Sequence, residues 1–158
     1  WPNDPVLGGK KLCGILTELS LEGETGRVQY LVLGIGVNVL HVAEDFSPEV
    51  AEMATSLSLA LGHPVSRPAL AAAEIRALDR LYASLLAGDL TPYLAAYRRS
   101  CVNLGRTVQL ISPDGSRETA QALDVDEDFS LVVRTASGAV KTVRSGEVSV
   151  RGMYGYTE

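Results

Sequence analysis

The sequence predicts an α+β fold, in which a partial mixed or antiparallel sheet with packed helices is followed by a small antiparallel β-barrel. Two long apolar segments near the start of the chain alternate in the way that adjacent strands do. Helix signals dominate the middle third, and five short strand-like segments separated by turn residues fill the last third. We therefore expect one domain over residues 1–102 and a second, barrel-like domain over residues 103–158.

The first two strands are expected over residues 11–20 and 28–39. The polar stretch between them contains two glycines and predicts a hairpin loop, so the strands should be antiparallel. Alternation in the second strand places Gly34, Gly36 and Asn38 on one face. The opposite face is apolar and is expected to pack against helices (Leu31, Leu33, Ile35, Val37 and Val39).

Helix signals follow. A serine, a proline and a glutamate predict a helix start at residue 47, and the apolar spacing carries this helix to a stop at Gly62. A second helix is expected from residue 67 to Gly88, and a third, short one begins at Thr91. Beyond residue 103 the pattern predicts strands over residues 107–111, 117–125, 130–135, 140–143 and 148–151.

Composition excludes several classes of function. A net charge of −5 without a local basic run argues against a nucleic-acid-binding surface. No apolar stretch is long enough to cross a bilayer, so we expect no membrane association. Cys13 and Cys101 lie far apart and have no neighbouring zinc ligands, and we read them as buried thiols of a cytoplasmic protein.

A turn with an amide, an acid and a lysine opens the chain, and it suits an anionic ligand. Asn3 and Asp4 precede a Gly-Gly turn, and Lys11 follows it at the entry to the first long strand. Two alternatives remain at this level. Lys10 and Lys11 could both be solvated turn residues, as lysines usually are. Asn3 and Asp4 could cap backbone amides of the turn.

The glycines of the second strand also indicate a ligand. Glycine weakens a strand and often marks a close approach by a ligand or by another backbone segment, so Gly34 and Gly36 have either meaning. A bulge or tight helix packing is the structural alternative. Asn38 favours a ligand, because an amide donates to and accepts from a nucleobase edge at once.

Five segments, taken in order, resemble biotin protein ligases of the bacterial BirA type. They are WPND at 1–4, KLCGILTEL at 11–19, LGIGVNV at 33–39, ATSL at 54–57 and SGEVSVR at 145–151. The resemblance implies a catalytic domain fragment of the class II synthetase-like type, followed by an SH3-like barrel. It also implies a two-step reaction. Biotin and MgATP form biotinyl-5′-AMP and pyrophosphate, and a lysine of biotin carboxyl carrier protein then displaces AMP.

Residue by residue, the resemblance implies a biotin site built on Lys11 and three glycines. Lys11 matches the lysine that contacts the reacting carboxylate and the α-phosphate. Gly14 matches a backbone contact to the biotin ring system, and Gly34 and Gly36 match glycines against which biotin or its adenylate lies. A regular strand, however, would place Lys11 and Gly14 on opposite faces, so a bulge or a contact made by the glycine backbone is required.

The remaining matches lie on the nucleotide side. Trp1 and Asn38 match adenine-side positions, and Asn3 and Asp4 match residues close to the phosphate and the acceptor lysine, with Asn3 assigned to ATP or adenylate binding and Asp4 to catalysis. No metal ligand is assigned firmly, and Asp4 is the residue expected nearest to Mg²⁺.

The family's lysine before WPND and its upstream glycine- and arginine-rich loop are absent from the chain. We therefore expect the chain alone to have little or no ligase activity. Two other functions stay open: a non-catalytic module that docks the carrier protein, and part of a bifunctional ligase and biotin-operon repressor. The resemblance also suggests a homodimer formed through sheet edges.

Overall fold

The computed structural model describes residues 2–145 and 149–152. Trp1 and the segment Gly146–Val148 of the SGEVSVR motif lie outside the described residues. The chain packs as two compact units, one formed by residues 2–65 and the other by the described residues from 66 onward. Each unit is considered by itself.

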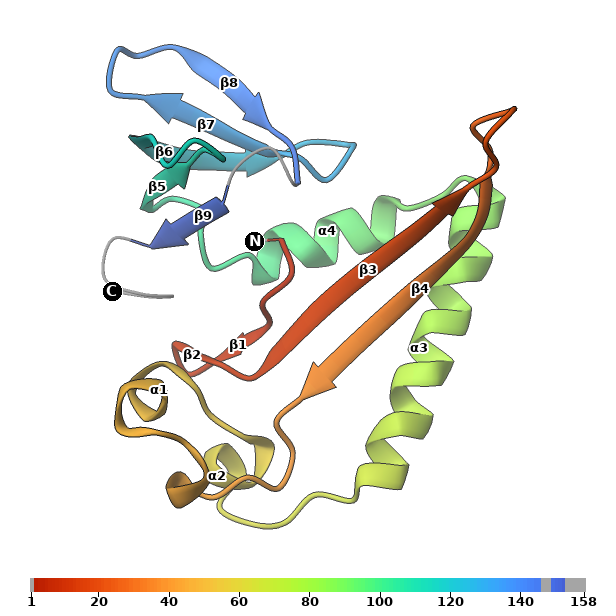
Figure 1. Ribbon diagram of the computed structural model, residues 1–158, viewed down its shortest axis with the longest axis vertical. Helices are drawn as coiled ribbons and strands as arrows, with labels where there is room; N and C mark the ends of the chain where they lie inside the picture. The colour runs from red at the N-terminus through yellow and green to blue at the C-terminus, as the bar shows by residue number, and fades with distance from the viewer. Residues whose placement is uncertain (1, 146–148, 153–158) are drawn as a thin grey trace. The chain divides into compact units, whose positions relative to one another are not determined.

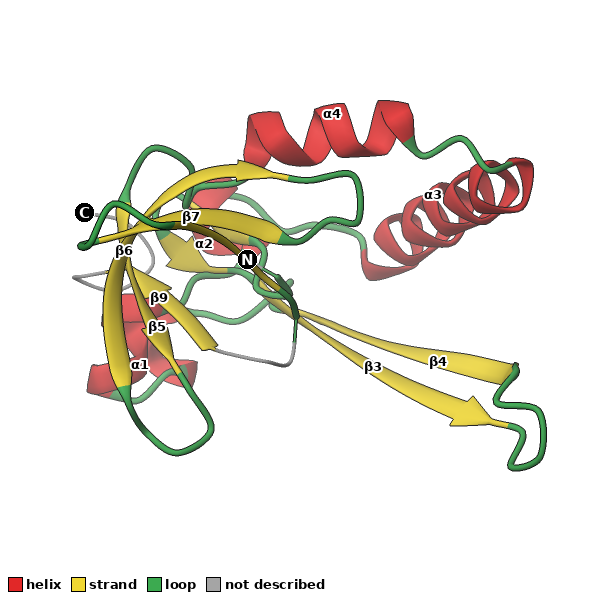
Figure 2. Cartoon of the chain, turned by 90° about the horizontal axis from the view of Figure 1, so that it is seen from above, coloured by secondary structure: helices red, strands yellow, loops and turns green. Residues whose placement is uncertain are grey.

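A long antiparallel hairpin dominates the first unit, as predicted. β1 (Val6–Leu7) and β2 (Lys10–Lys11) form a short ladder around the Gly-Gly turn. β3 (Cys13–Leu21) then pairs with β4 (Val28–Val37), and the two strands run as a narrow ribbon in Figures 1 and 2. The register places Gly14 directly opposite Gly36 and Leu16 opposite Gly34.

The first long strand does not begin at Lys11, so that expectation is wrong. The ladder breaks at Leu12, where the amides of Leu12 and Cys13 both donate to the carbonyl oxygen of Pro5, at 2.9 and 3.2 Å. Two successive donors on one acceptor do not fit the alternation of a regular strand, in which neighbouring amides point in opposite directions. The backbone is therefore rotated about the strand axis at Leu12, compared with a regular strand.

The single helix expected over residues 47–62 is also wrong, because the structure divides it into α1 (Pro48–Met53) and α2 (Leu57–Leu61). Between them Ala54 forms a parallel β-bridge with Lys11, and the Thr55 amide donates to the Lys11 carbonyl at 2.9 Å. These contacts with β2 take backbone groups that a continuous helix would have used internally. A short 3₁₀ turn, η1 (Ala43–Asp45), precedes the pair.

The hairpin keeps large apolar side chains exposed. Leu31 and Leu33, which we expected to pack against helices, are 50% and 43% exposed, so this expectation is wrong for them. The other face is equally open, with Leu16 at 64% and Tyr30 at 60%. A sheet of two strands has too little area to bury either face, and no third strand pairs with it among the described residues.

Two helices open the second unit: the first ends at the predicted glycine, and the second begins at the predicted threonine. α3 (Arg67–Ala87) begins after Ser66, whose hydroxyl accepts a hydrogen bond from the Ala69 amide, and it stops at Gly88 in the left-handed conformation. α4 (Thr91–Ser100) follows with a proline in its first turn. Among the described helices, none has the length and apolar character that a bilayer span requires.

The five predicted strands of the last third are confirmed with small shifts at their ends. They are β5 (Thr107–Ile111), β6 (Arg117–Val125), β7 (Leu131–Thr135), β8 (Val140–Val143) and β9 (Ser149–Gly152). All pairs are antiparallel, in the order β8-β7-β6-β5-β9. The core of the protein lies here and includes Leu94 from α4 (Leu94, Val108, Leu110, Ala120, Ala122, Val125, Leu131, Val133 and Val143).

α4 is fixed to this sheet by a charged and an aromatic contact. Arg98 donates through Nε to the carbonyl of Val125 at 2.7 Å and pairs with Asp124 at 2.9 Å. Phe129, which has a positive φ of 60°, packs edge-on against Tyr97 with ring centroids 5.8 Å apart. Burial raises the pKa of the Tyr97 hydroxyl well above its usual range, so this residue stays neutral.

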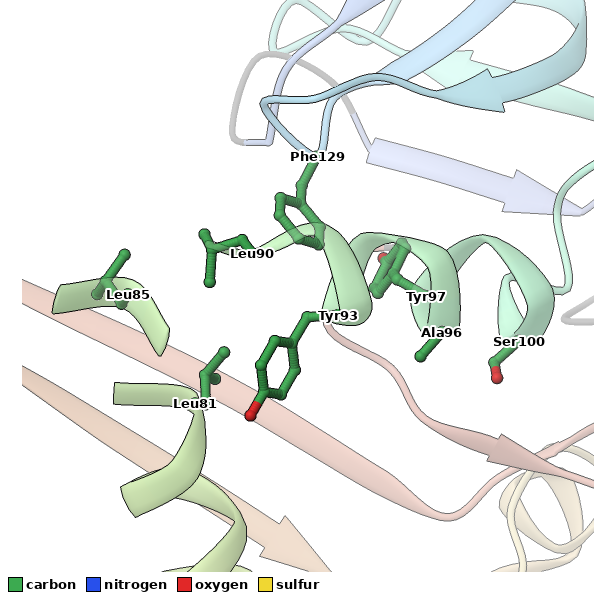
Figure 3. A pocket seen from close by; sticks show the side chains of 8 residues that line it. All are labelled: Leu81, Leu85, Leu90, Tyr93, Ala96, Tyr97, Ser100 and Phe129. Atoms are coloured by element: carbon green, nitrogen blue, oxygen red, sulfur yellow. The ribbon is translucent and has the colours of Figure 1, made fainter. Parts of the chain in front are cut away.

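Beside this contact lies an open apolar groove of about 600 Å³, shown in Figure 3. Its lining comes from the end of α3, from α4 and from the turn between β6 and β7 (Leu81, Leu85, Leu90, Tyr93, Ala96, Tyr97, Ser100 and Phe129). The turn is held by Asp126, whose carboxylate accepts hydrogen bonds from the amides of Asp128 and Ser130. These bonds stabilise the left-handed backbone at Phe129.

Two valines on neighbouring strands test where the core lies. Val133 is fully buried, whereas Val140 is 59% exposed. We expect Val133→Ala to lower the stability of the sheet by roughly 1–3 kcal/mol, since it removes buried methyl groups and leaves a cavity, and Val140→Ala to change it by less than about 0.5 kcal/mol. Amide hydrogen exchange of β5–β7 measures both. Equal effects would contradict this assignment of the core.

Candidate functional site

The break at Leu12 places the Lys11 side chain on the same side of the hairpin as Gly14. A Cβ atom added to Gly14 would lie 3.6 Å from Cε and 3.7 Å from Nζ of Lys11. The lysine stem therefore runs across the bare α-carbon of Gly14. The opposition of Lys11 and Gly14 that strict alternation predicts does not occur, because the chain between them is irregular.

Asp4 completes an ion pair at this position. Its Oδ1 lies 2.7 Å from the Lys11 ammonium, and the Asp4 side chain is only 12% exposed, against 38% for Lys11. Asn3 binds Ile15 twice: its carbonyl accepts from the Ile15 amide at 3.0 Å, and its Nδ2 donates to the Ile15 carbonyl at 3.0 Å. Backbone and side chain of Asn3 thus attach the turn to β3 and fix the position of Asp4.

The two adjacent lysines have different partners. Lys10 donates from Nζ to the carbonyl of Ala51 at 2.7 Å, where it satisfies an acceptor in the last turn of α1. Lys11 instead pairs with Asp4. The Lys10 side chain is exposed and that of Lys11 partly so, but each has a partner within the protein. Lys10 holds a helix end, and Lys11 presents its ammonium beside the glycines.

Among the described residues, no steric demand accounts for Gly34 and Gly36. A Cβ on Gly36 would lie 3.7 Å from the Gly14 carbonyl oxygen, and one on Gly34 would lie 3.7 Å from the Leu16 carbonyl oxygen. Both distances are ordinary contacts. Neither glycine sits at a bulge, since the ladder is regular here and shifts only beside Ser20. Because Gly34 and Gly36 carry no side chains, this part of the hairpin face is flat and its backbone is accessible to a ligand.

Asn38 lies just past the end of β4, where its groups hold neighbouring segments. Its amide N–H donates to the Leu12 carbonyl at 2.9 Å, and its side-chain Nδ2 donates to the Thr55 carbonyl at 3.1 Å. Its own carbonyl accepts from the Leu57 amide at 2.9 Å. Asn38 therefore links the end of β4 to Leu12 and to the segment that contains Thr55 and Leu57.

The segment Ala54–Leu57 connects these parts; it is the ATSL segment of the resemblance, for whose residues we expected no particular role. Thr55 binds both Lys11 and Asn38 through its backbone. Ser56 is fully buried; its hydroxyl donates to the His41 carbonyl at 2.6 Å and accepts from the Leu59 amide at 3.1 Å. A Thr-Ser pair inside an otherwise apolar helical pattern was the sequence signal, because buried hydroxyls need hydrogen-bond partners.

The structure thus brings together most of the predicted residues of the first unit. Asn3, Asp4, Lys11 and Gly14 form one cluster at the start of the hairpin, and Gly36 lies opposite Gly14. Asn38 joins the cluster through Leu12. Trp1 is outside the described residues. A cation beside an open glycine-lined backbone can bind an anionic group whose flat body lies against the sheet.

Ser56 and Ser66 provide a matched test of this connection, because both cap helices but only Ser56 is buried. Ser56→Ala removes a cap and leaves the His41 carbonyl without its donor, so we expect a loss of about 1–3 kcal/mol in the stability of the first unit. Ser66→Ala removes one exposed cap and should cost about 0.5–1 kcal/mol. Hydrogen exchange within each unit measures the two. A smaller effect at Ser56 would contradict the stabilising role of its buried hydrogen bonds, by which it clamps α2 to His41.

Comparison with known proteins identifies relatives of the chain. Residues 104–151 match the family described as "Biotin protein ligase C terminal domain". The bifunctional ligase/repressor BirA of Bacillus subtilis is 29% identical over 150 residues, which is 95% of this chain and 45% of the relative. The biotin--[acetyl-CoA-carboxylase] ligase of Mycobacterium tuberculosis is 33% identical, over 94% of this chain and 51% of the relative. The chain thus spans about half the length of these curated relatives.

Solved structures share the fold. The apo structure of biotin protein ligase from Aquifex aeolicus superposes with a TM-score of 0.81 at 24% identity, covering 96% of this chain and 63% of that one. The same enzyme in complex with biotin and ATP gives a TM-score of 0.79. The predicted resemblance is thereby confirmed: the chain is similar in sequence to proteins named as biotin ligases over about 95% of its length, and residues 104–151 match their C-terminal domain.

Proposed function

We propose that the chain is part of a biotin protein ligase, which forms biotinyl-5′-AMP from biotin and ATP and transfers biotin to a lysine of biotin carboxyl carrier protein. The observation that carries the proposal is the Lys11 ammonium, which lies over Gly14 and beside the glycine-lined backbone. Relatives named as ligases support it. So does the neighbour solved with biotin and ATP.

In this proposal Lys11 binds the biotin carboxylate. It also stabilises the negative charge that develops when this carboxylate attacks the α-phosphate of ATP. The flat backbone at Gly14, Gly34 and Gly36 accepts the body of biotin and of its adenylate. By the resemblance, Trp1 and Asn38 belong to the adenine side and Asn3 lies close to the phosphate. The hydrogen bonds of Asn3 to Ile15 of β3 and of Asn38 to Thr55 fix the positions of these two residues.

The described residues do not by themselves fit a resident Mg²⁺ ion. No three side chains of His, Cys, Asp or Glu gather around a common point in the described part of the chain. Asp4, the nearest carboxylate in our proposal, is already paired with Lys11. We therefore assign no step of the reaction to the metal.

Substitutions at the two lysines separate a catalytic from a structural role. In the full-length gene product, Lys11→Ala should lower biotin-dependent ATP–pyrophosphate exchange on the order of 10²–10³-fold, as the loss of a charge-stabilising group does. Lys10→Ala removes only the bond to Ala51 and should change the rate by no more than a few fold. Equal rates for the wild type and Lys11→Ala would contradict the proposed role of Lys11. Absence of exchange in the wild type as well would favour the alternative of a docking module without catalysis.

The 158 residues taken alone are expected to show little or no exchange. Lys11 and the glycines form one side of the proposed site, and the described hairpin residues around them, among them Leu16 and Leu33, remain exposed and enclose little of a bound adenylate. The measurement is biotin-dependent incorporation of labelled pyrophosphate into ATP by the purified chain. Sustained exchange at a rate comparable to that of a complete ligase would show that the chain contains the whole catalytic site.

A further inference from the structure

We propose that Asp4 is an internal counter-anion, which occupies the Lys11 ammonium in the empty site and is exchanged for the anionic group of the ligand. This inference rests on the proposed function, because it assigns a regulatory partner to the same lysine. The two groups are in direct contact at 2.7 Å. An entering carboxylate must therefore either displace Asp4 or share the ammonium with it.

The backbone delivers Asp4 to this position. Asn3, before it, is bound to Ile15 by two hydrogen bonds, and Pro5, after it, accepts from the amides of Leu12 and Cys13. Both flanks of Asp4 are thus attached to the same strand that carries Gly14. The carboxylate is more buried than its partner, so Lys11 is the member of the pair with access to an arriving ligand.

The lysine also has the freedom that an exchange requires. Its stem crosses the α-carbon of Gly14, where it meets no side chain, and its own side chain is 38% exposed. A partly exposed ion pair contributes little net free energy, because solvent screens it and the long side chain loses rotamer freedom. The ammonium can therefore turn from Asp4 to a ligand at small cost.

A second anion near the same ammonium is opposed by the charge of the first. While Asp4 is ionised, it competes with a carboxylate ligand and repels it. The affinity of the site for such a ligand is then lower than Lys11 alone would provide. Removing the charge of Asp4 should tighten the binding of biotin, the reverse of what the loss of a direct binding residue would do.

Titration calorimetry of the full-length gene product with biotin, without nucleotide or divalent cation, tests the exchange. Asp4→Asn should lower the Kd of biotin by about two- to fivefold, the range expected for a partly exposed charge pair. Lys11→Ala should raise the Kd. In the Lys11→Ala background, Asp4→Asn should have no further effect, because the competition acts only through the ammonium.

Two controls keep the result specific. Glu44→Gln removes a carboxylate charge from the exposed η1 turn of the same unit and should leave the Kd unchanged. Asp4→Ser replaces Asp4→Asn if the asparagine variant does not fold, as judged by its circular dichroism. Either variant should tighten binding.

An affinity of folded Asp4→Asn equal to or below that of the wild type would overturn the exchange and leave the biotin site standing. An unchanged advantage of Asp4→Asn in the Lys11→Ala background would also overturn it, because the effect would not pass through Lys11. Absence of biotin binding in the wild type and in every variant would overturn the proposed function, and the exchange with it.

Discussion

The carbonyl oxygen of Pro5 accepts two successive amides, and the rest of the site depends on this contact. By binding both Leu12 and Cys13, it interrupts the strand between Lys11 and Gly14. A regular strand would point the lysine away from the glycine face. With the interruption, the Lys11 stem crosses Gly14 and its ammonium meets Asp4. One irregular residue thus decides on which side of the hairpin the positive charge lies.

The interruption takes the backbone carbonyls of Lys11 and Leu12 out of a regular ladder, and these groups need other hydrogen-bond partners. The Lys11 carbonyl, displaced from a regular ladder, accepts the Thr55 amide, and the Leu12 carbonyl accepts the amide of Asn38. Backbone polar groups away from water need such partners. The break between α1 and α2 has the same origin, since Ala54 and Thr55 serve β2 and not a helix. The position of Lys11 in the site and the break between α1 and α2 therefore result from the same set of backbone hydrogen bonds.

Local patterns predicted the second unit well. Alternation and turn residues located β5 to β8, and prolines and glycines marked the ends of α3 and α4, because these signals act between residues close in sequence. The break between α1 and α2 was not predicted, because it depends on a bond between segments far apart, that of Thr55 with Lys11. The irregularity at Leu12 was anticipated only as one of two ways to bring Lys11 and Gly14 to the same face. Lys11, Gly34 and Gly36 were singled out from the turn and strand patterns, and the family resemblance added Gly14 and an expected role for each residue. The clamp at Ser56 was missed, although a buried hydroxyl pair within an apolar pattern indicated it.

The most direct test of a site built on Lys11 is a map of amide chemical-shift changes in the full-length gene product as biotin is added. We expect the largest changes at Gly14, Gly34 and Gly36, together with a shift of the Lys11 side-chain resonances and little change in β5 to β8. Changes confined to the second unit, for example around Phe129 and the groove beside α4, would contradict a biotin site on the glycine face.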